Sequence, residues 1–219
     1  MKPTRTSKAW MREHLNDPFV KKARLEGYRS RAAYKLMEID DRDRLLLPGT
    51  TVVDLGAAPG GWSQVARMRV GAQGRVWAID LLPMAPLEGV TFIQGDFNAP
   101  EVRDALAAVL PEGGADLVLS DLAPNISGVA LYDQARAAEL WDAALEFAVN
   151  TLKPKGKFLV KVFHGSDFET YVRRLRLLFE SVTTRKPAAS RDRSPEVYLL
   201  GKTLKPGARE QLRQLFYPE

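Results

Sequence analysis

The chain has 219 residues, of which 45% are hydrophobic, and it carries a formal net charge of +5. This length and composition predict one globular unit with a substantial core and exclude wholesale disorder. No apolar run is long enough for a transmembrane helix, and the charged first residues lack the apolar region of a secretory signal. Because cysteine is absent, the chain has no disulfide, thiolate metal site or cysteine nucleophile. We therefore expect a cytoplasmic protein with no metal site and no membrane association.

Basic residues gather in two segments of the chain. Residues 1–35 hold ten Lys or Arg against three acidic residues, and residues 171–193 hold seven against two. The remainder is net acidic, and two basic segments on such a body are typical of a protein that binds a polyanion. Solvated surface charge is the plainer alternative. The N-terminal segment predicts phosphate contacts by four residues: Lys21, Lys22, Arg24 and Arg31.

The first 30 residues mix aromatic and basic side chains without a strand pattern, so we expect a helical or irregular arm there. The next segment predicts a helix from Ser30, a candidate N-cap, to Ile39. Pro48 and Gly49 then mark a turn before the first strand.

From residue 51 the chain alternates between short apolar runs and amphipathic segments. The runs predict strands at residues 51–55, 75–79, 90–94, 115–120 and 157–163. Helices are predicted at residues 61–69, 100–110, 132–152 and 167–179. The apolar runs are nearly continuous, as expected for parallel strands covered on both faces. This order predicts a doubly wound α/β sheet.

The C-terminal part breaks this alternation. Two further strands, at residues 182–184 and 196–203, are joined by a loop without a helix, which predicts an antiparallel hairpin that closes the parallel sheet. A short helix could follow. We therefore divide the chain into a basic arm (1–30), one α/β domain (31–203) and a C-terminal tail (204–219).

A glycine-rich turn, Asp-Leu-Gly-Ala-Ala-Pro-Gly-Gly-Trp over residues 54–62, follows the first strand. Its glycines, Gly56, Gly60 and Gly61, remove side chains where a ligand must touch the backbone. The second strand ends at Asp80, whose carboxylate can accept hydrogen bonds from a ribose diol. Ligands of open α/β sheets bind beyond the carboxyl ends of the strands. The turn and the acid therefore predict a nucleoside-cofactor site.

The spacing of this turn favours S-adenosylmethionine. The phosphate-binding G-x-G-x-x-G and Walker A patterns are absent, whereas D-x-G-x-x-P-G-G suits a cofactor without phosphate. Asp80 would bind the ribose, Asp96 the adenine amine, and Gly60 and Trp62 the methionine end, through backbone approach and packing. The candidate cofactor residues are Asp54, Gly56, Pro59, Gly60, Gly61, Trp62, Asp80, Leu81, Asp96, Phe97 and Asp121. In the plainer alternative, the glycines serve only a tight turn and the acids only cap helices.

Lysine is rare inside an apolar strand, yet Lys161 lies within Phe-Leu-Val-Lys-Val-Phe. A buried, unpaired ammonium is costly, and Asp121, at the end of the fourth strand, is a candidate partner. Glu196 begins the antiparallel last strand and should therefore lie at the same edge of the sheet. A buried ion pair that only orders the sheet is the alternative, but such pairs stabilise weakly. We expect a reactive site at this edge.

These residue types suit methyl transfer to a ribose hydroxyl. The hydroxyl is a weak nucleophile until a base removes its proton, and a neutral lysine amine can do so. An unperturbed lysine has a pKa of about 10.4, and a second lysine nearby would lower such a pKa by charge repulsion. Neither the cysteine used to methylate pyrimidine C5 nor the Asn-Pro-Pro-Tyr type of motif used for base amino groups is present. Of these methyl acceptors, the ribose oxygen is the one that the sequence favours.

Seven segments carry a specific combination of motifs. They are Ser30-Arg-Ala-Ala-Tyr-Lys-Leu36, Val52-Val-Asp-Leu-Gly-Ala-Ala-Pro-Gly-Gly-Trp-Ser-Gln64, Asp80-Leu-Leu-Pro-Met84, Gln94-Gly-Asp-Phe97, Ser120-Asp-Leu-Ala-Pro-Asn-Ile-Ser-Gly128, Val160-Lys-Val-Phe163 and Glu196-Val-Tyr198. Together they resemble the RrmJ/FtsJ family of ribosomal RNA large-subunit 2′-O-ribose methyltransferases, from Trp10 to about Lys202. The glycine-rich turn alone would indicate only a methyltransferase.

The resemblance implies a Lys-Asp-Lys-Glu catalytic set at Lys35, Asp121, Lys161 and Glu196, in which Lys161 takes the proton and Lys35 tunes it. Lys35 enters only through this resemblance, because a lysine on an amphipathic helix usually faces solvent. The family fold is Rossmann-like, with a seven-stranded, mostly parallel sheet that ends in an antiparallel hairpin, and its cofactor is S-adenosylmethionine.

The substrate implied by the resemblance is a uridine of 23S ribosomal RNA within the large ribosomal subunit. Methyltransferases of tRNA or of an mRNA cap share the four residues and are an alternative. A ribosome-assembly factor that mainly binds RNA is another. We expect a monomer.

Overall fold

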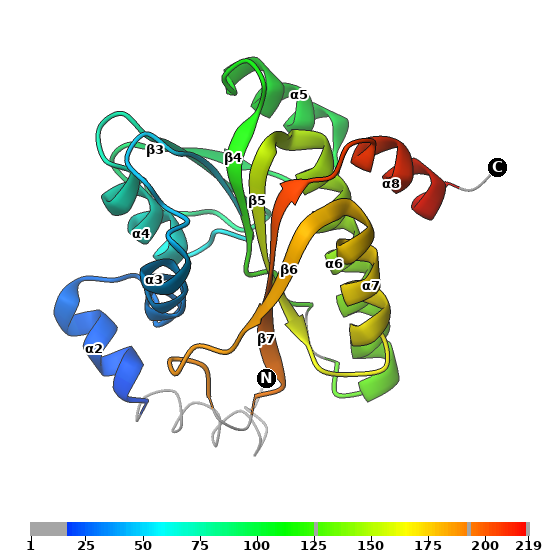
Figure 1. Cartoon of the computed structure of the whole chain (residues 1–219). Coiled ribbons are helices and arrows are strands. Elements are labelled where there is room, and N and C mark those ends of the chain that lie inside the picture. Colours follow the sequence, from blue (N-terminus) through cyan, green and yellow to red (C-terminus); the bar gives the residue numbers. More distant parts are fainter. Residues whose placement is uncertain (1–16, 125–126, 192–193, 218–219) are drawn as a thin grey trace.

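Seven strands form one mixed sheet with the order β3-β2-β1-β4-β5-β7-β6 (Figure 1). The computed structural model describes residues 17–124, 127–191 and 194–217. The strands are β1 (Thr51–Leu55), β2 (Arg75–Asp80), β3 (Val90–Gln94), β4 (Ala115–Ser120), β5 (Leu152–Phe163), β6 (Phe179–Arg185) and β7 (Glu196–Leu204). The first five strands run parallel, and β7 is antiparallel to both β5 and β6. The predicted doubly wound sheet and its closing hairpin are confirmed.

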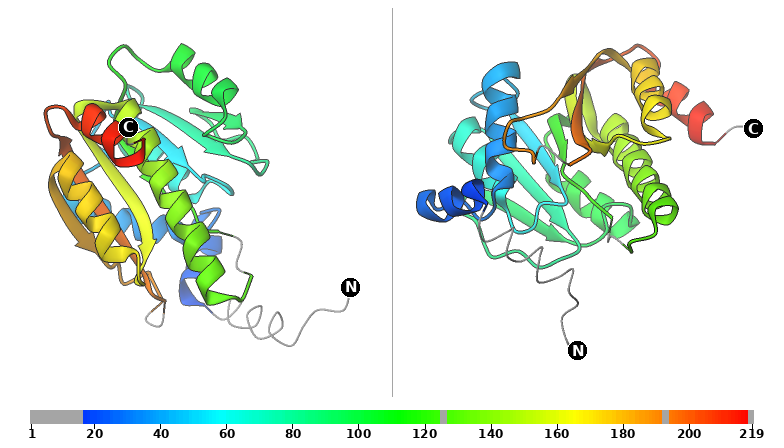
Figure 2. Two further views of the ribbon diagram at one scale, coloured as in Figure 1. Left: turned by 90° about the vertical axis from the view of Figure 1, so that its right-hand side faces the viewer. Right: turned by 90° about the horizontal axis from the view of Figure 1, so that it is seen from below.

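Helices cover both faces of the sheet (Figure 2). They are α2 (Pro18–Glu26), α3 (Ala32–Asp43), α4 (Gly61–Val70), α5 (Pro100–Val109), α6 (Ala130–Thr151), α7 (Phe168–Leu178) and α8 (Ala208–Phe216). On one face, Leu36 of α3 and Val65 of α4 share a core with Val52. On the other face, Leu145 of α6 shares a core with Val53. Adjacent residues of β1 thus point to opposite faces, as the pleat of a strand requires.

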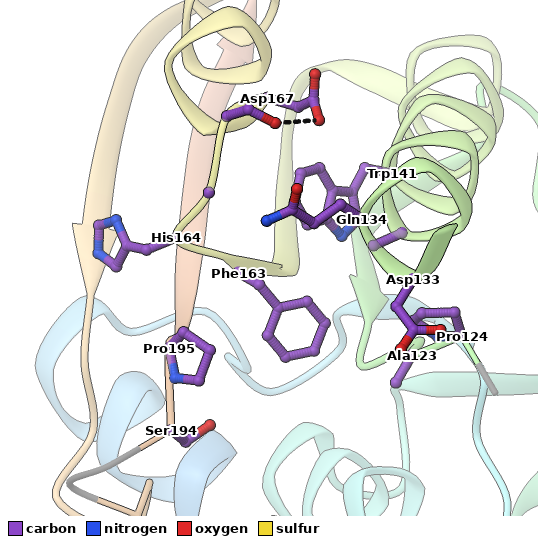
Figure 3. A pocket seen from close by; sticks show the side chains of 13 residues that line it. Ala123, Pro124, Asp133, Gln134, Trp141, Phe163, His164, Asp167, Ser194 and Pro195 are labelled. Carbon is purple, nitrogen blue, oxygen red and sulfur yellow. Dashed lines mark hydrogen bonds between the residues drawn. The ribbon is translucent and has the colours of Figure 1, made fainter. Parts of the chain in front are cut away.

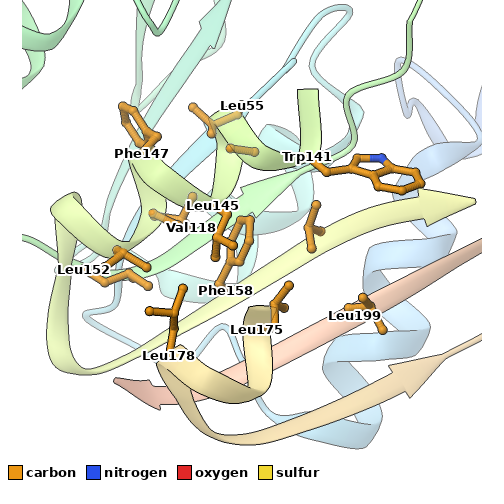
Figure 4. Close-up of a cluster of buried hydrophobic side chains, with 14 of the residues drawn as sticks. Leu55, Val118, Trp141, Leu145, Phe147, Leu152, Phe158, Leu175, Leu178 and Leu199 are labelled. Carbon is orange, nitrogen blue, oxygen red and sulfur yellow. The ribbon is translucent and has the colours of Figure 1, made fainter. Parts of the chain in front are cut away.

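The larger core lies between the middle of the sheet and helices α6 and α7 (Figure 4). Phe158 and Leu199 from the sheet pack with Leu145 and Leu175 from the two helices, and all four are 0% exposed. Burial of one such side chain stabilises the fold by roughly 1.5–3 kcal/mol. This core fixes the strands whose ends carry the polar residues of the site.

The start of α3 differs from the prediction. The N-cap residue is Arg31, and no side chain caps the helix. The predicted N-cap role of Ser30 is wrong, because its side chain packs against Gly61 at the start of α4. In addition, α6 begins at Ala130 rather than residue 132, and β5 begins at Leu152 rather than residue 157.

Both ends of the described chain pack against the sheet domain. The Asp17 carboxylate caps α2 by accepting backbone hydrogen bonds from its first turn, and α2 buries Val20 and Ala23. In the tail, α8 forms a helix as expected and packs Leu212 against the larger core. Residues 1–16 of the predicted basic arm lie outside the described residues. None of the described helices combines the length and apolarity needed to span a membrane.

Candidate active site

The glycine-rich turn between β1 and α4 has a left-handed backbone at two positions. Gly56 and Gly60 have φ values of 74° and 108°, which residues with a side chain rarely adopt. A Cβ at Gly56 would lie 2.6 Å from the Leu122 side chain, and one at Gly60 would lie 3.0 Å from Met84 Sδ. The turn therefore requires glycine both for its conformation and for its surroundings.

Two acidic residues follow the neighbouring strands at the same edge of the sheet. Asp80, the last residue of β2, accepts hydrogen bonds of 2.8 Å from the N–H groups of Ala58 and Leu82. Asp96 follows β3, is exposed, and accepts one from the N–H of Asn98. A carboxylate can accept about four hydrogen bonds, so both groups retain capacity for a ribose diol and an adenine amine.

The start of α4 suits a negatively charged group. The first N–H groups of a helix lack acceptors within it and carry partial positive charge. Here they include those of Gly61 and Trp62, which directly follow Gly60. Together with the glycine turn and the two carboxylates, these donors fit the carboxylate, ribose and adenine of S-adenosylmethionine.

Two predicted cofactor residues have their side chains in the core. The Trp62 side chain is buried, and its Nε1 donates to the Ala32 carbonyl at 2.8 Å. Phe97 packs edge-on against Phe147, with 5.8 Å between the ring centroids. Both residues can therefore reach a cofactor only through their backbone. Leu81, in contrast, is 68% exposed beside Asp80.

Arg29 ties this turn to the loop after β2, a role that sequence reasoning missed. Its guanidinium donates to the carbonyl oxygens of Pro59 at 3.2 Å, and of Ala85 and Pro86 at 2.7 Å. These acceptors lie 30 to 57 residues further along the chain. A single arginine in a basic segment gives no sequence signal of such contacts.

Four charged residues form two ion pairs at the carboxyl ends of β4 and β5. Lys161 Nζ lies 3.1 Å from Asp121 Oδ1 and donates to the Asp121 carbonyl oxygen at 2.6 Å. Lys35 Nζ lies 2.5 Å from Glu196 Oε1. The side chains of Lys35 and Lys161 are only 11% and 9% exposed. The structure thus brings together the four residues expected from the resemblance.

Tyr198 lies between the two ion pairs, and sequence reasoning gave it no role. Its hydroxyl donates to Asp121 Oδ1 at 3.0 Å, and its ring centroid lies 5.9 Å from Lys35 Nζ. In the sheet, Tyr198 pairs with Lys161 across β5 and β7. The available signal was its spacing, because a residue two positions after Glu196 shares its face of the strand.

The ion pairs shift the pKa values of neighbouring acidic groups. Burial raises the pKa of Glu196, but the charge and hydrogen bond of Lys35, with the charge of Lys161, outweigh this effect and hold the pKa below its usual value. Burial and the negative charges of Asp121 and Glu196 raise the pKa of Tyr198 well above its usual value. Near neutral pH, Glu196 is therefore ionised and the Tyr198 hydroxyl remains a donor.

Asp54 is fully buried at the end of β1. Its Oδ2 accepts a hydrogen bond of 2.6 Å from Ser63 Oγ, whereas Oδ1 has no partner within the described part of the chain. Burial, together with the charges of Asp121 and Asp80, raises the pKa of Asp54 to about 7 against the effect of Ser63. Asp54 therefore contributes a protonated carboxyl below neutral pH.

The raised pKa of Asp54 predicts a contribution to stability that falls as pH rises. Between the unfolded pKa of about 3.9 and the folded pKa of about 7, only the folded state holds this proton. The unfolding free energy then falls by up to ~1.4 kcal/mol per pH unit. The variant Asp54→Asn lacks this linkage and should lose less stability over the same interval. Urea denaturation at several pH values measures the difference, and parallel pH curves for the two proteins would contradict it.

The residues predicted to contact phosphates differ in their surroundings. Three are exposed on α2: Lys21, Lys22 and Arg24. Arg31 instead forms an ion pair with Asp17 and donates to the Ala189 carbonyl, which ties the start of α3 to the loop between β6 and β7. Arg31 also lines a cavity of about 360 Å³, which we call the basic hollow; its other lining residues are Lys35, Arg191, Ser194 and Glu196.

Several known proteins match this chain in sequence. The sequence profile of the FtsJ-like methyltransferase family matches residues 28–204, which contain the glycine-rich turn and both ion pairs. Ribosomal RNA large subunit methyltransferase E of Dechloromonas aromatica is 62% identical over 205 residues, which cover 94% of this chain and 100% of that protein. The protein of the same name from an Azoarcus species is 61% identical, with 94% and 100% coverage.

A solved structure extends the match to three dimensions. The crystal structure of a ribosomal RNA methyltransferase from Plasmodium falciparum is 31% identical and covers 81% of this chain and 98% of its own, with a TM-score of 0.74. The family profile, the identities and the shared fold agree with the glycine turn and the paired lysines at the sheet edge. The chain therefore belongs to the FtsJ-like methyltransferase family.

Proposed function

We propose that this protein transfers a methyl group from S-adenosylmethionine to the 2′-hydroxyl of a uridine ribose in 23S ribosomal RNA of the large subunit, in the cytoplasm and as a monomer. The names of the relatives, which are large subunit methyltransferases, support the RNA class. The observation that carries the choice of atom is the buried pair of Lys161 and Asp121 at the same sheet edge as the glycine-rich turn. A buried lysine suits proton removal from a hydroxyl.

The cofactor would be held by groups at three strand ends. S-adenosylmethionine supplies a methyl group on a positively charged sulfur. Asp80 and Asp96 would accept hydrogen bonds from its ribose and adenine, and the N–H groups at the start of α4 would bind its carboxylate. Arg29 keeps the turn in place from outside.

Lys161 acts in this proposal as the proton acceptor. Its amine is held between the Asp121 carboxylate and carbonyl oxygen, at 3.1 and 2.6 Å, so its position is restricted before substrate arrives. The neutral amine would take the proton of the 2′-hydroxyl as its oxygen bonds to the methyl carbon. The S–C bond would break in the same step, and its electron pair would stay on the sulfur, which leaves as a neutral thioether. The resulting ammonium lies beside Asp121, which stabilises its charge.

Lys35, which the resemblance implies to tune Lys161, acts in this proposal also on the ribose oxygen. Glu196 remains ionised because its pKa is held low, and it fixes Lys35 at 2.5 Å. A fixed positive charge stabilises negative charge that develops on the attacking oxygen. The two lysines thus have different roles, one at the proton and one at the oxygen.

Mapping of 2′-O-methyl groups tests the proposed function. Unmodified large ribosomal subunits, incubated with the protein and S-adenosylmethionine, are expected to gain one alkali-resistant linkage at a uridine of 23S rRNA. Transfer RNA and capped mRNA in parallel reactions should gain none. A methyl group found on a base, or only on tRNA or a cap, would contradict the proposal. RNA binding without methyl transfer would indicate an assembly factor instead.

The exposed bases of α2 predict a salt-dependent contribution to RNA binding. A variant with glutamine at Lys21, Lys22 and Arg24 should bind RNA more weakly and lower the slope of log K against log salt by ~0.7–0.9 for each lost phosphate contact. Titrations at several salt concentrations measure this. Arg31 is left intact because Asp17 binds it.

A matched control removes the same charge from the opposite part of the molecule. Three exposed residues serve for this substitution by glutamine: Arg75, Lys155 and Arg213. This variant should keep the wild-type slope. Equal losses in the two variants would show that only total charge matters and would refute specific contacts by α2.

A further inference from the structure

A cavity of about 350 Å³ lies beside the ion pairs, on the side of the sheet that α6 and α7 cover (Figure 3). Its walls are the segment after β4, the segment after β5, the N-terminal part of α6 and the residues before β7. We call it the edge pocket, and its principal lining residues are Ala123, Pro124, Gln134, Trp141, Phe163 and Pro195. This volume is within the range of small-molecule sites.

The edge pocket begins directly next to the catalytic set. Phe163 follows Lys161 by two residues, and Pro195 directly precedes Glu196. Lys161 Nζ lies 5.9 Å from the centroid of the Phe163 ring. A group held by the Lys161 amine is therefore within reach of the pocket wall.

The edge pocket is separate from the cofactor turn. The turn and its acidic residues follow β1, β2 and β3, whereas the pocket follows β4 and β5 and precedes β7. In the sheet order, β4, β5 and β7 lie together on one side of β1. The cofactor and the occupant of this pocket would thus approach the lysines from different sides.

The walls of the edge pocket suit a flat and uncharged aromatic group. Trp141, Phe163 and Pro195 provide aromatic and apolar surface, on which nucleobases stack. Asp133 and Asp167 also line the pocket, and their negative charges oppose the entry of a phosphate. A base therefore fits this pocket better than a phosphate or a carboxylate does.

Gln134 adds a neutral polar group to these walls. Figure 3 shows its amide projecting from α6 into the space between the walls. A carboxamide can donate and accept a hydrogen bond at the same time. This pair of functions matches the adjacent N–H and C=O groups on the edge of a uracil ring.

We propose that the edge pocket binds the base of the nucleotide whose ribose is methylated, and this inference rests on the proposed ribose methylation. The base is attached to C1′, which is bonded to the C2′ atom that carries the reacting hydroxyl. Placing that hydroxyl at Lys161 therefore places the base beside Phe163. To enter, the base leaves its stack in the RNA, as bases do in other nucleic-acid-modifying enzymes.

The basic hollow continues this site on the other side. Ser194 lines both the edge pocket and the basic hollow. Arg31 and Arg191, which share Asp17 as an ion-pair partner, line the hollow, where their positive charge suits a backbone phosphate of the same strand. The edge pocket, the lysines and the basic hollow thus follow the order of base, ribose and phosphate in one nucleotide.

Two variants that fill the pocket from opposite walls test the proposal. Ala123→Phe adds a ring from the exposed segment after β4, and Gly165→Leu adds a side chain from the loop after β5. A Cβ at Gly165 would lie 3.2 Å from Gln134 Nε2, so the new side chain enters the pocket. Neither position is part of an ion pair. Ala135→Phe is the control, because Ala135 is exposed on α6 and outside the pocket lining.

Single-turnover methylation of large ribosomal subunits gives the decisive readout. At saturating RNA, both pocket variants are expected to lose at least about tenfold in rate, because the 2′-hydroxyl no longer reaches Lys161. Their affinities for RNA and for S-adenosylmethionine should stay within about threefold of wild type, because phosphate contacts dominate RNA binding. Ala135→Phe should keep the wild-type rate.

Other outcomes overturn the inference. Wild-type rates in both filled variants would show that the pocket stays empty during transfer. A loss confined to RNA affinity, with an unchanged rate at saturation, would show that the pocket holds another part of the RNA. If one variant loses S-adenosylmethionine binding through misfolding, the other decides. Failure of the proposed function is distinct, because wild-type protein would then form no 2′-O-methyl group.

Discussion

Replacing Lys161 by alanine is expected to lower the single-turnover rate of methyl transfer by ~10²–10⁴-fold, the usual contribution of a general base. The amine is the group at the sheet edge that the Asp121 carboxylate and carbonyl oxygen hold in place. Without this amine, no positioned base removes the proton of the 2′-hydroxyl, and the hydroxyl attacks as a weak nucleophile. The rate with saturating RNA and cofactor measures the loss, and binding of S-adenosylmethionine should remain near wild type.

Lys157→Ala provides the matched control for this experiment. Lys157 lies on β5 four residues before Lys161, on the same face of the strand, and donates to the Arg44 carbonyl at 3.0 Å. Its removal should leave the rate within about twofold of wild type. A Lys161→Ala enzyme that transfers methyl groups at the wild-type rate would remove Lys161 from the mechanism.

Replacing Asp121 by alanine is expected to lower the rate by ~10²-fold, which is the cost of a misplaced reacting group. The Asp121 carboxylate holds the amine of Lys161 and accepts a hydrogen bond of 3.0 Å from the Tyr198 hydroxyl. Removing the carboxylate therefore frees both side chains. Asp121→Asn keeps an acceptor for the Tyr198 hydroxyl, so its rate should fall less than that of Asp121→Ala. Tyr198→Phe leaves the ion pair of Lys161 and Asp121 intact, so its rate should fall least of the three.

Asp121→Ala is also expected to destabilise the fold. Breaking a buried pair costs ~3–5 kcal/mol, and the loss here should be smaller because the Asp121 side chain is 18% exposed. Asp116→Ala is the matched control, because Asp116 lies on β4, which Asp121 directly follows, in a partly exposed pair with Lys153. Such a pair contributes ~0–1 kcal/mol. Asp116 also accepts a hydrogen bond of 2.9 Å from the Thr51 N–H, so this control should lose some stability but keep the wild-type rate. Equal stability and rates in the two alanine variants would contradict the assigned role of Asp121.

The strands of this fold were predictable because burial on both faces demands continuous apolar sequence. The segments Thr51–Leu55 and Ala115–Ser120 contain such runs, and both strands have the predicted bounds. The start of α3 was not predictable in the same way. Ser30 has the residue type of an N-cap, but its side chain packs against Gly61, which is distant in sequence. Tertiary packing overrode the local preference.

The candidate site was predictable where a residue is out of place in its local sequence. Lys161 is a charge inside an apolar strand, and Asp80 ends a buried strand, so both attract attention without a structure. Lys35 has no such signal, because its helix also carries other charged residues, and its burial depends on Glu196. Arg29 was missed for the same reason, since its acceptors come from distant loops.

The edge pocket illustrates a different limit of sequence reasoning. Its walls combine short segments from four parts of the chain, and none of them has a motif of its own. Phe163 and Trp141 read in sequence as ordinary core residues, and each is indeed mostly packed. Their role in recognising the substrate follows from their arrangement, in which Phe163 lies next to Lys161 and Trp141 packs against Phe163.

The pH dependence of methyl transfer tests the central role of Lys161 most directly. Single-turnover rates of the wild-type enzyme with large ribosomal subunits should be measured from about pH 6 to 10, where chemistry limits the rate. A general base accepts a proton only in its unprotonated form, so a rate that depends on one rises with pH wherever the base is mostly protonated. Glu196 stays ionised over this range, because its pKa is held below the usual value. We therefore expect a rate that rises into alkaline pH, and a flat profile over the whole range would contradict proton removal by Lys161.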